Sequence, residues 1–284
     1  MFEVNALERF YFRVETEWLE AQAGRKNQQL IRQTTEKARR RTSGQVLSKI
    51  TTTDEAGRHR IIDEFPVIRH DDVIDLDQVA LLFDEYRQTV RTDIAVLLQQ
   101  FRVVDAVLRI VGVGSVGTRC FILLLLGPSD EPLIIQVKEA PPSALETYGG
   151  LHRVPLPEAG REGWRVVAGQ HILQAVSDPF LGWVTYDDRD FYCRQFRDMK
   201  GSVELETLSA TQFGEYGAMC GAVLARAHAQ SPEAATLQEY LGKGGRFVDA
   251  VCTWAAAYAD QVERDFATLE RAVRDGRLPC ESGV

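Results

Sequence analysis

Three glycines and one lysine form the pattern in this chain that is best suited to chemistry. Gly112, Gly114 and Gly117 follow a G-x-G-x-x-G spacing. Ser115 lies within that spacing, and Lys138 ends an apolar run further along the chain. Glycine has no Cβ, so a glycine-rich turn lets backbone amides approach phosphate oxygens closely. A lysine ammonium brings a compact positive charge to the same oxygens. The pattern therefore indicates a turn and a cation that bind phosphate groups.

Segments rich in β-forming residues surround the glycines and carry the lysine. We expect strands over 102–113, 118–126 and 132–138, because Val, Ile and Leu dominate there. A strand rather than a helix follows Gly117, which argues against a Rossmann turn, whose glycines open a helix. The order of strand, glycine turn, strand and lysine-ending strand is typical of the way protein kinases hold ATP. A tight hairpin without a ligand and a strand-end lysine in solvent remain the alternatives.

A kinase lysine normally pairs with a glutamate on a nearby helix. Glu139, Glu146 and Glu162 are the candidates, and Glu146 is favoured because it lies on a short helix expected directly after the lysine. Strand alternation predicts that Glu139 points to the opposite face from Lys138. The helix expected over 164–176 contains no carboxylate. Spacing alone does not choose between these glutamates.

The motifs that perform phosphoryl transfer are absent from the sequence. It contains no H-R-D or H-G-D catalytic loop and no D-F-G or D-F-D metal-binding motif. Phosphoryl transfer needs a residue that orients the nucleophile and ligands for Mg²⁺. We therefore expect no catalytic residue and no metal ligand here, and no appreciable kinase activity from this chain alone. His228, Asp260 and Glu263 are better explained as a helix-end histidine and as solvated acids.

The composition excludes several classes of protein. Hydrophobic residues make up 45% and charged residues 26% of the 284 residues, as in ordinary globular proteins. A net charge of −8 argues against general nucleic-acid binding, although the basic stretch 25–41 allows an RNA or membrane contact besides a solvated helix face. No apolar run is long enough for a membrane span, and the five cysteines show no C-x-x-C spacing. Without a visible signal peptide, a cytoplasmic location is the expectation.

The remaining pattern predicts helices, a β-hairpin and two further strands around the glycine-containing segment. The order predicts an α+β fold with a small antiparallel sheet and a mainly helical body. We expect three regions: a helical segment with a β-hairpin over 1–100, a nucleotide-cradling sheet with a helix over 101–200, and a helical body over 201–284. The further elements expected are a helix over 6–41, strands over 45–53 and 58–68, a helix over 77–100, strands near 181–186 and 190–197, and helices over 208–230, 234–242 and 246–275.

Residues from about 100 onward resemble a bacterial family known only as domain of unknown function 2252. The resemblance rests on the segments RIVGVGSVGTRC (109–120), QVKEAPPSALE (136–146), GWRVVAGQHILQAVSDPFLGW (163–183), YCRQFRDMKGS (192–202) and CGAVLARAHAQS (220–231). Members look like distant, circularly permuted relatives of protein kinases and aminoglycoside phosphotransferases, with H-G-D-A-H-x-x-N and N-D-F-D segments ahead of this region. The resemblance implies that the chain is truncated and corresponds to the C-terminal part of such a protein.

The resemblance implies two functions that the sequence leaves open. In the first, the chain is the ATP-binding portion of a kinase-like phosphotransferase and is inactive alone. ATP would then contact the glycine turn, Lys138 and Glu146, and Mg²⁺ would bind only if the missing segment were supplied. In the second, the chain is a non-catalytic binding subunit, or a remnant of a split gene. It would pair with a partner chain that carries the H-G-D and N-D-F-D motifs. The phosphoryl acceptor is not readable from these residues.

Overall fold

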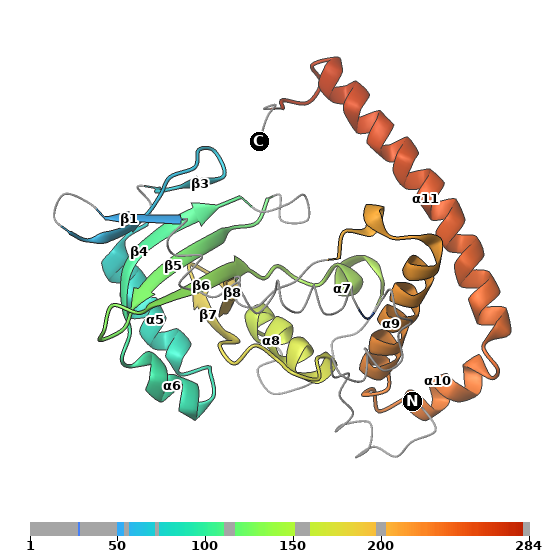
Figure 1. Ribbon diagram of the computed structural model, residues 1–284, viewed down its shortest axis with the longest axis horizontal. Coiled ribbons are helices and arrows are strands. Elements are labelled where there is room, and N and C mark those ends of the chain that lie inside the picture. Colours follow the sequence, from blue (N-terminus) through green and yellow to red (C-terminus); the bar gives the residue numbers. More distant parts are fainter. Residues whose placement is uncertain are drawn as a thin grey trace.

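The computed structural model describes Gln28 and residues 50–53, 57–71, 74–110, 117–150, 160–196 and 203–280. In these parts the protein is mixed α and β, and its centre is an antiparallel sheet (Figure 1). Apart from Gln28, the helix expected over 6–41 lies outside the described residues, and so does the first part of the strand expected over 45–53. The description below therefore begins at Ile50.

The central sheet has six antiparallel strands in the order β3-β4-β5-β6-β8-β7. Three of its strands, β4, β5 and β6, form a meander, and β8 then pairs with β6 and carries β7 at the edge. Strands β4 to β8 confirm the expected β segments to within a few residues; β4 ends at Arg109, and residues 111–113 of the strand expected over 102–113 lie outside the described residues. The strands are β3 (Ile68–Arg69), β4 (Arg102–Arg109), β5 (Cys120–Leu126), β6 (Pro132–Glu139), β7 (Gly182–Tyr186) and β8 (Arg189–Gln195).

Alternation along the strands gives this sheet two different apolar faces. One face packs against helix α5 (Leu76–Arg87), and we call it the α5 face; its strand residues include Ala106, Leu123, Ile135, Val137 and Cys193. The opposite face carries a second cluster formed by Ile61, Ile68, Val107, Ile122, Leu124, Ile134 and Phe196. Lys138 shares the side of β6 that carries Ile134, so we call this second side the Lys138 face.

The helix expected over 77–100 is interrupted. It forms α5 and a separate α6 (Thr92–Leu98). Thr89 explains the break: its hydroxyl lies 2.8 Å from the Tyr86 carbonyl and 2.9 Å from the Trp183 backbone nitrogen. A threonine hydroxyl that bonds to backbone groups outside the helix competes with the helical hydrogen bonds. Because Trp183 is remote in sequence, local periodicity could not predict this end of α5.

A two-stranded hairpin lies beside the sheet. Its strands β1 (Thr51–Thr53) and β2 (His59–Ile61) pair antiparallel, which confirms the expected hairpin in its described part. The segment expected as one strand over 58–68 is divided, however, into β2 and β3. Asp105 of β4 accepts a hydrogen bond of 2.6 Å from the Ile61 amide, so a buried carboxylate fastens the hairpin to the sheet.

The other helices follow the expected order. A short α7 (Ala144–Tyr148) and then α8 (Glu162–Leu173) come between β6 and β7, and a 3-10 turn (Leu205–Thr207) precedes the last three helices. These are α9 (Ala210–His228), which a Ser209 capping box begins, α10 (Ala234–Leu241) and α11 (Gly245–Arg274). In Figure 1, α11 lies apart from the sheet, and none of its residues is buried. None of the described helices is apolar and long enough to cross a bilayer.

Candidate functional site

Lys138 lies at the centre of one end of the sheet. In the strand register it is opposite Cys120 on β5 and opposite Tyr192 on β8. Directly paired residues of antiparallel strands project from the same side of a sheet. The half-buried Lys138 side chain is therefore flanked by Cys120 and Tyr192 on the Lys138 face. In the described part of the chain, no ion pair joins Lys138 to a carboxylate.

Two arginines lie near the lysine on the same face. Arg194 of β8 is opposite Gln136, and Arg109 of β4 follows Val107 by two residues, so alternation gives both the same side as Lys138. Burial raises the pKa of the Cys120 thiol, while positive charge from Lys138, Arg109 and Arg194 opposes that rise. We refer to Arg109, Lys138 and Arg194 as the basic cluster. The buried Cys120 thiol is therefore close to the three positive charges of the basic cluster.

The described part of the protein supplies hydrogen-bond acceptors for only some of the donors of the basic cluster. The buried Nε of Arg194 has no hydrogen-bond partner within the described ranges. The guanidinium of Arg109 lies 4.8 Å from the ring centroid of Phe196, a cation–π contact. A buried donor that no protein atom satisfies loses free energy relative to its hydrated state. An anion on this face would supply the missing acceptor and offset the positive charge.

Two of the three candidate glutamates are paired with arginines rather than with Lys138. Glu139 belongs to the α5 side of the strand, as expected: it accepts a 2.9 Å hydrogen bond from the Arg119 amide and pairs with Arg189 at 2.7 Å. Glu162 begins α8 and pairs with Arg165 at 2.6 Å. Glu146 lies in α7, and no ion pair within the described segments links it to Lys138. The pairing of Lys138 with Glu146 therefore stays a prediction.

Only the end of the glycine turn is described. Gly112, Gly114 and Ser115 lie outside the described residues, whereas Gly117 has a φ of +84°. Nothing lies within 4 Å of the position that a Cβ on Gly117 would occupy. Residues with side chains rarely adopt such a φ, so the turn requires glycine here. Because Cys120 is opposite Lys138, this turn ends beside the basic cluster.

Helix α8 covers the β7–β8 end of the Lys138 face. Gly163 permits this contact, because a Cβ there would come within 2.4 Å of the Phe191 carbonyl oxygen. The Arg161 guanidinium lies 6.0 Å from the Trp183 ring and donates a 2.9 Å hydrogen bond to Thr185. Helix α8 thus covers the part of the Lys138 face that β7 and β8 form.

Sequence reasoning did not group Arg109 and Arg194 with Lys138. Arg109 shares a side with Val107 on its strand, so alternation carried a signal for it. It also missed a network around His70, whose Nε2 lies 3.1 Å from Asp105 and whose Nδ1 lies 2.8 Å from Asp63. That network is formed by residues of the hairpin region and β4, and it stabilises the contact between them.

A family model with the description "Uncharacterized protein conserved in bacteria (DUF2252)" matches residues 1–272. The match therefore includes the residues before position 100 as well as the segments quoted above for the later part. Comparison with curated proteins finds no match. Comparison with solved structures finds none either.

Proposed function

The chain belongs to this bacterial family, and from that premise we propose that its Lys138 face binds the phosphate groups of a nucleotide, ATP in the first instance. The observation that carries the proposal is the basic cluster. Lys138 and Arg194 lie together on one face, within the described residues neither forms an ion pair, and the turn at Gly117 ends beside them. A phosphate group has the charge and the acceptors that such a cluster lacks.

The order of elements supports a kinase-like arrangement. The glycine turn joins β4 to β5, the lysine ends β6, and helix α8 precedes the β7–β8 hairpin. The resulting sheet, β4-β5-β6-β8-β7, places the lysine strand at its centre, with α8 on the same face as the lysine. In protein kinases the corresponding lysine contacts the α- and β-phosphates, and the glycine turn covers them. This chain offers Lys138 for the first role and Gly112, Gly114, Ser115 and Gly117 for the second.

The proposed activity is binding without phosphoryl transfer. A base and Mg²⁺ ligands carry most of the catalysis in kinases, and the sequence has neither H-G-D nor N-D-F-D. No group of three His, Cys, Asp or Glu side chains in the described residues could hold a metal ion. We therefore expect Mg²⁺ to add little to ATP affinity in the isolated chain. The phosphates would be neutralised by the basic cluster instead.

An alternative function is supported by α11. Its apolar side chains are exposed along the whole helix, and Trp254 stacks on Tyr258 with ring centroids 4.9 Å apart. An apolar surface of this extent on a protein usually marks a contact with another molecule. The chain would then be a non-catalytic subunit that pairs with a protein carrying the H-G-D and N-D-F-D motifs. Both functions can coexist, because α11 and Lys138 lie on different elements.

Equilibrium titration of the purified chain with ATP tests the proposal. We expect Lys138→Met to weaken ATP binding about tenfold or more, because a hydrogen bond to a charged group contributes about 1.5–3 kcal/mol. The matched control is Lys243→Met, which removes an exposed lysine near the start of α11. Equal ATP affinity in wild type and Lys138→Met would contradict the proposal. ATP turnover that is lost in Lys138→Ala would contradict the expected inactivity.

A further inference from the structure

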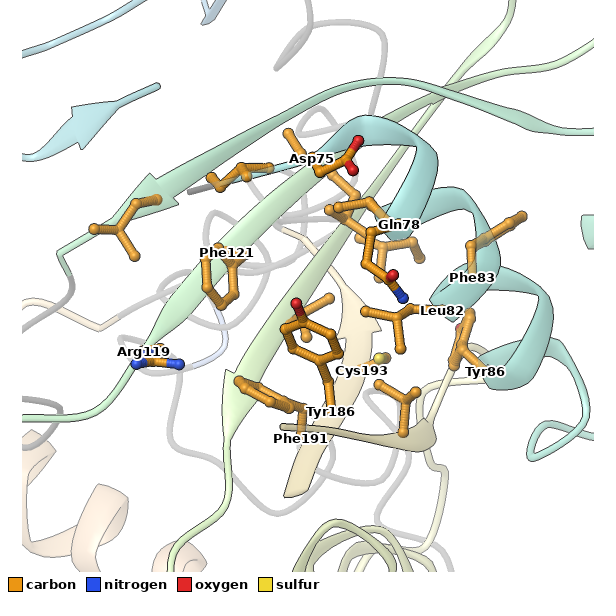
Figure 2. A pocket seen from close by; sticks show the side chains of 18 of the residues that line it. Asp75, Gln78, Leu82, Phe83, Tyr86, Arg119, Phe121, Tyr186, Phe191 and Cys193 are labelled. Atoms are coloured by element: carbon orange, nitrogen blue, oxygen red, sulfur yellow. The ribbon is translucent and has the colours of Figure 1, made fainter. Parts of the chain in front are cut away.

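The α5 face contains a second candidate site, separated from Lys138 by the thickness of the sheet. A cavity of about 380 Å³ lies between α5 and the strands (Figure 2). Most of its lining is apolar, and it includes Leu82, Phe83, Phe121, Val184, Tyr186 and Phe191. Cavities of this size and character are typical of small-molecule sites. Because the two sites are on opposite faces, this one does not depend on nucleotide binding.

The interior of the cavity has little to offer a polar molecule. The Tyr86 hydroxyl donates a 2.6 Å hydrogen bond to the Phe180 carbonyl, so its proton is already used. Cys193 is buried, and burial raises the pKa of its thiol, which keeps it neutral. The inner part of an occupant must therefore be largely apolar, since a polar group there that does not reach the Gln78 amide would lose its hydration without replacement.

The mouth of the cavity is different, because it carries one available cation. Arg119 lines the cavity, and only its backbone is engaged by the described residues, through the hydrogen bond to Glu139. Arg69 is paired with Asp71 at 3.4 Å, and the Asp75 carboxylate caps α5 by accepting from the Asp77 amide at 3.0 Å. Figure 2 shows Arg119 at one side of the cavity, next to the rings of Phe121, Tyr186 and Phe191. The charged groups at the mouth other than Arg119 thus have partners.

We propose that this cavity binds a small aromatic carboxylic acid. Its apolar body lies among Phe121, Tyr186 and Phe191, where offset or edge-on ring contacts are available, and its carboxylate meets the Arg119 guanidinium. A guanidinium binds a carboxylate through two parallel hydrogen bonds, which fixes the orientation of the acid. Binding involves no covalent step. Nothing on the Lys138 face takes part.

The test uses the full chain and a pair of probes that differ only in charge, 2-naphthoate and 2-naphthylmethanol. We expect naphthoate to bind at least about tenfold more tightly than the alcohol, and Arg119→Gln to remove that preference. Gln78→Trp, a change on a half-buried α5 residue that lines the cavity, should fill it and abolish binding of both probes. Arg277→Gln, at an exposed arginine beyond α11, is the control and should bind like wild type.

Circular dichroism confirms that each variant is folded before titration. The proposal is overturned if folded wild type binds neither probe at millimolar concentration, or if both probes bind equally. It is also overturned if Gln78→Trp leaves naphthoate binding intact. Trp254→Ser identifies binding to the exposed face of α11: loss of naphthoate binding in that variant alone would assign the probe to α11 and reject the cavity.

Discussion

Lys138 and Cys120 are directly opposite each other on β6 and β5, and both project from the Lys138 face of the sheet. The thiol is buried, which raises its pKa, and the lysine charge is the largest of the influences that lower it. Gln136 donates a weak hydrogen bond of 3.4 Å to the same sulfur. The pKa of Cys120 is therefore sensitive to the charge of the basic cluster.

This relationship predicts the effect of Lys138→Met on Cys120 reactivity. Removing the ammonium should raise the pKa of Cys120 further and lower its alkylation rate at a fixed pH near 8, because only the thiolate reacts. The measurement is iodoacetamide labelling followed by mass spectrometry, in a background where the other four cysteines are replaced by serine. Lys243→Met serves as the control. An unchanged labelling rate would mean that Lys138 does not act on the thiol.

The glycine turn predicts a contrast between two glycine substitutions. Gly117→Ala should destabilise the chain by about 1–2 kcal/mol, because a Cβ is unfavourable at a positive φ. Gly169→Ala, inside α8 with open space around it, should instead stabilise the chain by up to about 1 kcal/mol. Urea unfolding followed by circular dichroism measures both. A Gly117→Ala chain as stable as wild type would show that the turn accepts side chains.

The His70 network predicts a pH dependence of stability. Burial would raise the pKa of Asp63, but hydrogen bonds from His70 and its charge lower it overall from the ordinary value of 3.8. A carboxyl with a lowered folded-state pKa contributes stability that is present above its unfolded pKa and is lost as the pH falls below it. Because Asp63 is half exposed, the contribution is about 1 kcal/mol or less.

Unfolding of wild type and Asp63→Asn between neutral pH and about pH 3 checks this sign. At neutral pH the free energy of unfolding should be higher for wild type than for Asp63→Asn. This difference should shrink as the pH falls below 3.8. Asp188→Asn, in the turn between β7 and β8, is a suitable control. A difference that grows toward acid pH would refute the assignment.

Much of the fold could be predicted from the sequence, because local patterns determine it. Runs rich in Val, Ile and Leu marked β4, β5 and β6, and the expected helices matched α8 and α9 to within a few residues. Alternation also gave the correct faces for Lys138 and Glu139. These features depend on neighbours in the chain, which is why periodicity finds them.

Features that depend on distant residues could not be predicted. Thr89 ends α5 by bonding to Trp183, and nothing within α5 indicates that bond. The basic cluster joins Arg109, Lys138 and Arg194 only through the register of four strands, which spacing along the chain does not specify. The cavity has the same origin, since its walls come from α5 and six strands that meet only in the folded protein.

Comparison of ATP with adenosine tests the central claim most directly. If the basic cluster binds phosphates, folded wild type binds ATP at least about tenfold more tightly than adenosine, and Arg194→Gln reduces that preference as Lys138→Met does. Calorimetric titration at low ionic strength, where such contacts are least screened, measures both ligands. Equal binding of ATP and adenosine, or a preference for ATP that survives both substitutions, would contradict the assignment of this face to nucleotide phosphates.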